Sequence, residues 1–274
     1  MSYCSALVIL CCFCVCGLYG IQYQPWLGNV FEFEARAGFR RQIGDSIAGH
    51  DDHDKHVNVN ANTGYASLGL TFDPAWSVEL ECLVSKTKRH HGFDTASIGC
   101  RHLWYNDLIG DFASLTTGIE LLYTRPAFLH DISLIRHGRY SAAAHASIGK
   151  EFGFTARSYF RTYATALVGA GDKSAAWTRG ETHLEWRYHE QHSIDAFFAA
   201  EQGLGNKGLR HPRAHDFRGY RHIEYSFLDA GLSYSYTWYP FATFYANVTQ
   251  RLHAHFCPKN TTSFEVGCLV PFSL

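Results

Sequence analysis

The feature that most constrains the fold of this chain is a regular alternation of apolar and polar residues that recurs along most of its length. In the segment Val30–Arg41, apolar side chains occupy the odd positions from 31 to 39, whereas glutamate, arginine and glycine occupy the even positions from 32 to 40. The segments Ala75–Ser85, Leu115–Thr124 and Glu181–His189 repeat this pattern. A period of two places successive side chains on opposite faces of a β-strand. Each segment is therefore predicted to be a strand with one apolar face and one charged face.

Twelve segments of this kind can be recognised in the chain. The alternation slips in phase near Gly64 and near Phe227, which predicts a β-bulge at each place. The predicted strands are residues 29–41, 57–72, 75–86, 93–106, 112–124, 139–151, 154–170, 179–190, 193–203, 219–238, 241–251 and 262–274.

The connections between these strands alternate in length. The long connections are 42–56, 87–92, 125–138, 171–178, 204–218 and 252–261, and the short ones are Asp73-Pro74, 107–111, Phe152-Gly153, 191–192 and Tyr239-Pro240. An even number of strands, with tight turns at one end and longer loops at the other, is typical of bacterial outer-membrane barrels. Closure also gives the last strand a partner at 30–41 and leaves no exposed edge. We therefore predict an all-β fold, a transmembrane up-and-down antiparallel β-barrel of about 12 strands that spans residues 21–274.

The competing interpretation is a large soluble β-sandwich, and two observations argue against it. Charged residues make up only 18% of the chain and aromatic residues 15%, whereas soluble domains carry about 25% charged residues. Aromatic residues also gather near the predicted strand ends, where the interface of a bilayer favours them. They are Trp76, Trp104, Tyr123, Tyr188, Trp238 and Tyr239.

Residues 1–20 form one apolar run that contains five of the nine cysteines. The run is short for a membrane-spanning helix and stands at the N-terminus, so it is interpreted as a secretory signal peptide. An uncleaved anchor helix is the alternative. Cleavage would leave Cys82, Cys100 and Cys268 on predicted lipid-facing positions, with Cys257 in the last long connection.

Two stretches carry a resemblance to known proteins. The alternating apolar residues of 262–274, with Phe272 and Leu274, resemble the sorting signal of Gram-negative outer-membrane proteins, although those more often end in Phe. The stretch 23–28 is similar to the opening of chlamydial outer-membrane proteins. The resemblance implies an integral outer-membrane location with periplasmic termini, a lipid bilayer as surroundings and assembly by the barrel-assembly machinery. Because chlamydial envelopes are disulfide-linked, it also makes Cys257 a candidate for cross-linking to a neighbour.

If the apolar faces meet lipid, the opposite faces point into the lumen and are charged on nearly every strand. The candidates for lining the lumen or a constriction are Glu32, Glu34, Arg36, Arg40, Glu79, Glu81, Arg101, Glu120, Arg157, Arg161, Glu185 and Arg187, and further inward positions are His145, His183, Asp195, Glu201, Glu224 and Asp229. Two hypotheses follow: a porin-like channel for small solutes with a charged lumen, or a closed barrel braced by arginine–carboxylate pairs that acts through its loops. No connection is much longer than the others, so we expect no dedicated plug.

Histidine and aspartate are dense in the first long connection, where they suit a divalent metal although their spacing matches no defined site. The weak metal candidates are His50, Asp51, Asp52, His53, Asp54 and His56, and a second cluster is His211, His215 and Asp216. A hydrolase or metal binder at the rim of the barrel is the third hypothesis. It ranks last because no motif of the outer-membrane proteases or lipid hydrolases is matched. The sequence predicts no cofactor, and its net charge of −1 gives no argument for nucleic acid.

Overall fold

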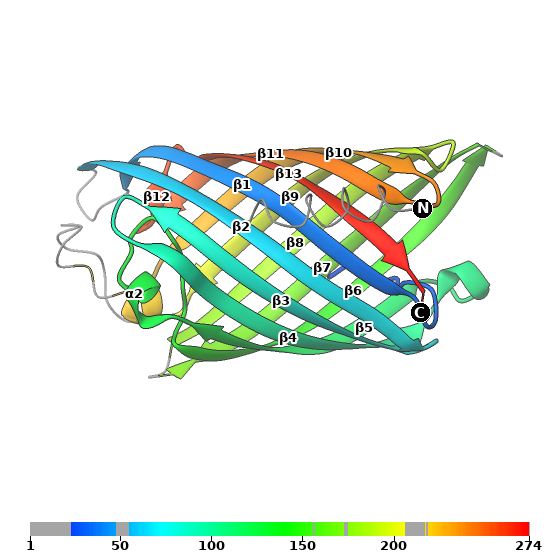
Figure 1. The fold of residues 1–274 in the computed structure, drawn as a ribbon, viewed down its shortest axis with the longest axis horizontal. Helices are drawn as coiled ribbons and strands as arrows, with labels where there is room; N and C mark the ends of the chain where they lie inside the picture. Colours follow the sequence, from blue (N-terminus) through cyan, green and yellow to red (C-terminus); the bar gives the residue numbers. More distant parts are fainter. Residues whose placement is uncertain are drawn as a thin grey trace, which may run out of the picture.

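Long antiparallel strands run the length of the molecule and close on themselves (Figure 1). The computed structural model describes residues 23–47, 55–155, 157–172, 175–205, 217 and 219–273. Within these ranges the twelve long strands are β1 (Phe33–Ile47), β2 (Lys55–Asp73), β3 (Trp76–Thr87), β4 (His91–Tyr105), β5 (Ser114–Thr124), β6 (Tyr140–Thr155), β7 (Ser158–Gly171), β8 (Ala175–Tyr188), β9 (His192–Gly203), β10 (Ser226–Trp238), β11 (Ala242–His255) and β13 (Thr262–Phe272). A two-residue strand, β12 (Pro258–Lys259), pairs with the end of β1.

Closure of the sheet depends on β1, which pairs with β2 along one edge and with β13 along the other. The β1–β13 register begins at Phe33 opposite Phe272 and ends at Ile43 opposite Thr262. Every long strand therefore has two neighbours, and the sheet leaves no row of unpaired backbone groups along its edge. The predicted all-β, twelve-stranded up-and-down barrel is confirmed, including the pairing of the last strand with the first.

Several predicted boundaries were wrong because the ladders continue further than the sequence pattern indicated. Residues Phe152-Gly153 are not a turn, since Phe152 pairs with Phe160 and the turn lies beyond Thr155. The connections 87–92 and 171–178 are short, because Lys86 pairs with His91 and Gly171 with Ala175. The ladders run through the predicted bulge near Gly64 without a shift. The bulge near Phe227 is confirmed as a register shift between Leu228 and Asp229.

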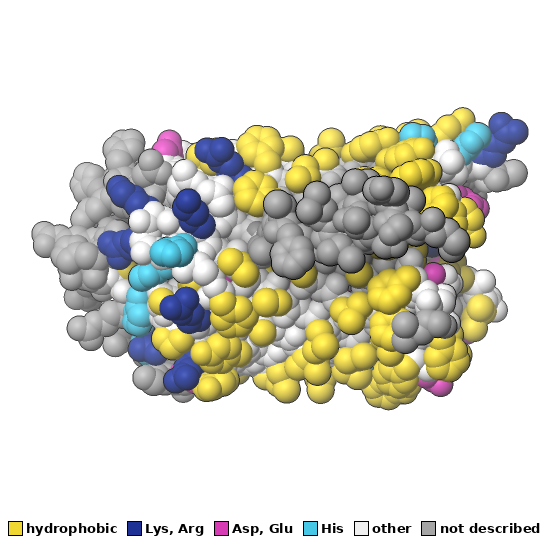
Figure 2. Space-filling model, in the orientation of Figure 1, with side chains coloured by type: hydrophobic (Ala, Val, Ile, Leu, Met, Phe, Trp, Pro, Cys, Tyr) yellow, Lys and Arg dark blue, Asp and Glu magenta, His cyan; other side chains and the backbone are white. Residues whose placement is uncertain are grey.

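The burial pattern is the reverse of that in a soluble protein. Along β3, Glu79 is 4% exposed, whereas its neighbour Leu80 is 51% exposed. Large apolar side chains cover the outside as a broad belt (Figure 2). A belt of this kind fits a lipid environment, and the closed sheet satisfies the backbone hydrogen bonds that lipid cannot. The aromatic side chains of Trp76, Trp104 and Trp238 point outward near strand ends, as predicted.

The two ends of the barrel differ. The turn end carries the tight turns β2–β3, β6–β7, β8–β9 and β10–β11, together with the 3-10 helix η1 (Asp107–Ile109) and the end of β13. The loop end carries the loop 125–139, which contains α2 (Pro126–Leu129), and the β9–β10 connection, which contains η3 (Tyr220–His222) (Figure 1). No helix in the described ranges is both long and apolar enough to span a membrane.

Candidate functional site

Arginine–carboxylate pairs line the inner wall of the barrel. Arg36 on β1 lies between Glu34, at 3.1 Å, and Glu79 on β3, at 3.3 Å. Arg40 donates two hydrogen bonds to Glu265 on β13, from Nη2 at 2.7 Å and from Nε at 3.0 Å. Such charge-assisted pairs offset the cost of placing charges inside a narrow barrel.

The structure places most of the predicted lumen residues on this inner face. They are Glu34, Arg36, Arg40, Glu79, Glu81, Arg101, Glu120, Arg161, Glu185 and Arg187. Three predicted inward positions lie elsewhere. Arg157 is exposed in the β6–β7 turn, because that turn falls later than predicted, and Glu224 is exposed before β10 begins. Glu32 precedes β1 and accepts a hydrogen bond from the Asn29 side chain at 2.6 Å.

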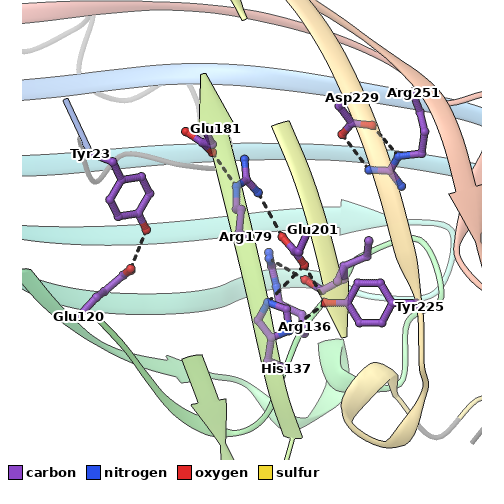
Figure 3. A network of polar contacts seen from close by, with 11 residues as sticks. Tyr23, Glu120, Arg136, His137, Arg179, Glu181, Glu201, Tyr225, Asp229 and Arg251 are labelled. Atoms are coloured by element: carbon purple, nitrogen blue, oxygen red, sulfur yellow. Dashed lines mark hydrogen bonds and ion pairs between the residues drawn. The ribbon is translucent and has the colours of Figure 1, made fainter. Parts of the chain in front are cut away.

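The segment 23–30, which precedes β1, enters the interior from the turn end. Its backbone oxygens accept hydrogen bonds from the wall, since Arg101 donates to Gln24 at 3.2 Å and Thr116 donates to Pro25 at 2.7 Å. The Tyr23 hydroxyl donates to Glu120 at 2.7 Å (Figure 3). The segment therefore occupies one side of the interior, against β4 and β5.

Trp26 fixes this segment beside β7. Its indole nitrogen donates to Asp107 of η1 at 2.9 Å, and the guanidinium of Arg161 lies 4.7 Å from the indole ring centre. The indole ring also meets the edge of Tyr163 at 5.8 Å. On the wall opposite Pro25, residue 149 is glycine, and a Cβ there would lie 2.7 Å from the proline ring. A larger residue at 149 would push the segment off the wall.

At the loop end, the loop 125–139 descends into the mouth of the barrel. Arg136 forms a two-pronged ion pair with Asp94 of β4 at 2.5 and 3.1 Å, and the Asp94 side chain is fully buried. Nearer the start of the loop, Asp131 accepts a hydrogen bond from Thr87 at 2.5 Å. The expectation of no dedicated plug was based on loop length, which does not determine whether a loop turns inward, and residues 133–136 of this loop line a cavity in the barrel.

An apolar cluster packs against this loop at the loop end. Ile132 packs with Tyr220 and Phe217 from the β9–β10 connection, and with Phe227 at the start of β10. The Tyr220 hydroxyl donates to the backbone oxygen of Ile132 at 2.8 Å. The cluster is a hydrophobic core in its own right, built from three connections, including Phe256 and Cys257 between β11 and β12, and from residues of the adjoining strands.

His137 belongs to the loop 125–139 and lies outside the strands. Its side chain contacts residues of β8 and β9 on the inner wall. Its ring stacks on Trp177 at 4.3 Å, Nδ1 lies 3.2 Å from the Tyr225 hydroxyl, and Nε2 lies 3.6 Å from the Glu201 carboxylate. Glu201 also accepts hydrogen bonds from Arg179, at 3.2 Å, and from Tyr225, at 2.7 Å (Figure 3). Burial lowers the pKa of His137 to about 4, although the Glu201 carboxylate opposes this change.

Beside the segment 23–30 and beneath the loop 125–139, the interior contains a series of polar cavities. The cavity at the turn end has a volume of about 450 Å³ and the next about 280 Å³, and both are walled by Gln24, Tyr245 and Glu265. A third, of about 80 Å³, shares Arg40 and Arg179 with the second and lies directly beneath residues 133–136 of the loop. The volumes of these three cavities decrease from the turn end to the loop end.

The sequence interpretation missed several residues of this interior. Arg179, Glu181 and Glu265 could have been found, because they share the parity of their strands with known inward positions. The contributions of Tyr23, Trp26, Arg136 and His137 lie outside any alternating pattern, and no sequence signal marks them.

Cys257 is fully buried in the loop-end cluster, where its thiol donates to the backbone oxygen of Ser226 at 3.4 Å. Burial raises its pKa to about 12. Cross-linking of Cys257 to a neighbour therefore does not fit this conformation. Of the metal candidates, His50, Asp51, Asp52, His53 and Asp54 lie outside the described residues, as does the side chain of His56. Within the described part of the chain, no three His, Cys, Asp or Glu residues are grouped to hold a metal ion.

No protein-family model matches the sequence. No curated protein matches it either. Among solved structures, the fold is similar to that of an outer-membrane channel from Pseudomonas putida F1, with a TM-score of 0.63 and 12% identity over 93% of this chain and 100% of that chain. It is also similar to the NanC porin, with a TM-score of 0.54 and 10% identity over 87% and 98% of the two chains. The β domain of the Bordetella autotransporter BrkA gives a TM-score of 0.50 and 13% identity over 89% and 100%. These likenesses establish that the chain has the closed barrel fold of outer-membrane proteins.

Proposed function

We propose that this chain is an integral outer-membrane channel for small polar solutes, held here with its loop end closed. The turn end, where β13 ends, faces the periplasm, as the short turns of bacterial barrels of this type do. Two of the three similar structures are a channel and a porin, which supports the proposal at the level of the fold.

The observation that carries the proposal is the series of polar cavities. Neighbouring cavities share wall residues from the turn end up to residues 133–136 of the loop 125–139. Their walls carry both positive and negative charges. The 450 Å³ cavity is lined by Arg36, Arg161 and Arg187 as well as by Glu34 and Glu265. A wall with both signs favours polar solutes without strong selection between cations and anions.

The test is conductance in planar bilayers, combined with swelling of liposomes in small and large sugars. Wild-type protein is expected to show infrequent small steps and to admit only the smaller sugars. The Arg136→Met variant, in which the loop loses its buried ion pair, is expected to open more often. A heat-modifiability gel on each preparation confirms that the barrel is folded. Silence of both folded proteins would contradict the proposal.

A closed barrel that acts through its loops is the second candidate, and the loop-end apolar cluster favours it. That cluster buries Ile132, Tyr220 and Phe227 as a core does, which suits a permanent closure. This function predicts no conductance from the wild type, from Arg136→Met or from a variant that lacks residues 126–135, while the loops remain accessible to protease on whole cells.

A further inference from the structure

Charge is unevenly distributed over the outer surface of the barrel. The exposed lysine and arginine side chains that the structure describes lie at the loop end, except for Arg157 in the β6–β7 turn. Those at the loop end are Arg41, Lys86, Lys88, Arg89, Arg125 and Arg139. Exposed carboxylates in the described ranges are Asp73, Asp111 and Glu190 at the turn end, and Asp45 and Glu224 at the loop end. Figure 2 shows the basic side chains gathered at one end of the apolar belt.

These basic residues also share one side of the barrel. They come from β1, β3, the β3–β4 turn and the two ends of the loop 125–139, all within the consecutive strands β1 to β6. On strands β7 to β11, no lysine or arginine of the described residues is exposed. Among the described residues, the exposed positive charge of the loop end therefore lies on the side formed by β1 to β6.

An outward row of aromatic rings supports this patch. Phe93 on β4 stacks on Tyr123 of β5 at 6.3 Å, and Tyr123 packs against Tyr140 of β6 at 5.4 Å. The Arg139 guanidinium lies 5.8 Å from the ring centre of Tyr123 and 5.3 Å from that of Tyr140. Aromatic rings of this kind favour the boundary between the acyl chains and the headgroups of a bilayer.

The positions of Arg125 and Arg139 are fixed by the backbone. The Arg139 amide donates to Asp172 at 2.6 Å, and the Arg125 amide donates to the backbone oxygen of Asp94 at 2.7 Å. No ion pair joins Arg41, Lys86, Lys88, Arg125 or Arg139 to a carboxylate of the described residues. Their charges are thus directed outward at the level where the apolar belt ends.

We propose that this basic patch, formed by Arg41, Lys86, Lys88, Arg125 and Arg139, binds the phosphate groups of anionic lipids in the leaflet that surrounds the loop end. A planar guanidinium can contact two phosphate oxygens at once, and lysine adds charge without fixed geometry. The aromatic row beneath lies against the upper acyl chains of the same lipid. The proposal concerns the outer surface and does not depend on whether the lumen conducts.

The test uses folded protein in a neutral detergent and follows the midpoint of thermal unfolding by heat modifiability. A ligand that binds only the folded state raises this midpoint. Phosphatidic acid is expected to raise it for the wild type, whereas phosphatidylcholine and inorganic phosphate at the same concentration have little effect. In Arg125→Gln/Arg139→Gln, the apparent affinity for phosphatidic acid should fall at least about tenfold, since each basic group near an anionic surface contributes about fivefold.

Arg157→Gln is the matched control, because it removes an exposed arginine at the opposite end. It should respond to phosphatidic acid as the wild type does. Equal affinity in the double variant, or an equal loss in the control, would overturn the proposal. A similar shift with inorganic phosphate would identify a site for free anions and would also overturn it. If the double variant does not fold, Lys86→Gln/Lys88→Gln tests the same patch and should lose affinity by a similar factor.

Discussion

At the turn end, the segment 23–30 meets the wall through backbone oxygens and through the side chains of Tyr23 and Trp26. At the loop end, the loop 125–139 is held by buried side chains. The segment borders the 450 Å³ cavity through Gln24, Trp26 and Leu27, where water can replace a lost hydrogen bond. The loop-end contacts combine an ion pair on a fully buried aspartate with an apolar cluster.

This difference implies that the segment 23–30 and the loop 125–139 respond differently to the loss of a contact. A polar contact beside water contributes little, because its partners can be hydrated when it breaks. A buried ion pair is costly to break, because the remaining charge is left without its partner, so we expect the loop to be either docked or released. We therefore expect the loop end to open and close as a unit and the turn end to set the width of the passage.

The largest effect is expected from Arg136→Met, which leaves the buried Asp94 without its ionic partner. Removing one partner of a buried pair costs about 3–5 kcal/mol, so loop closure should weaken by about that amount. The measurement is the rate of protease cleavage within 125–139 in proteoliposomes, located by mass spectrometry. The control is Asp94→Asn/Arg136→Met, which removes both charges and should recover part of the protection. Unchanged cleavage in the single variant would show that the apolar cluster holds the loop alone.

A smaller effect is expected from Trp26→Ala at the turn end. The substitution removes the hydrogen bond to Asp107 and the contact with Arg161, together worth about 2 kcal/mol. The segment 23–30 should detach from β7, so conductance per opening should rise while the midpoint of barrel unfolding stays the same. Trp76→Ala is the matched control, since that indole lies on the outer face. If both variants conduct alike, the segment does not limit the passage.

The smallest effect is expected from mild acid. His137 has a pKa of about 4 in the closed loop, compared with 6.5 when it is free. The closed state binds the proton less readily, so its stability is complete above pH 6.5 and falls as the pH drops from 6.5 towards 4. At pH 5.5 the loss is about 1.4 kcal/mol, and openings should be more frequent than at pH 7.5.

The groups that face His137 are Glu201, Arg179, Arg136, Trp177 and Tyr225. The control is His137→Phe, which keeps the ring against Trp177 and removes the titrating group. Its openings should not change between pH 7.5 and pH 5.5. If they change as in the wild type, another group is responsible for the pH response.

The sequence was sufficient to predict the wall of the barrel. Strand identity, order and closure follow from the period-two pattern, because a one-residue slip would turn a whole strand inside out. The same parity placed Arg36, Glu79 and Glu120 inside. Strand ends were predicted less well, as at Phe152, because a ladder stops where its partner stops and not where local residues suggest a turn.

The contents of the barrel were decided by the tertiary structure alone. The pairing of Arg136 with Asp94 joins residues 42 positions apart, and that of Tyr23 with Glu120 joins residues 97 apart. Neither segment alternates, so neither carries a periodic signal of where it will lie. Local sequence thus determined which face of each strand meets lipid, since that choice repeats at every second residue. Whether the lumen is open or closed depends on single long-range contacts, which form only once the wall has placed their partners opposite one another.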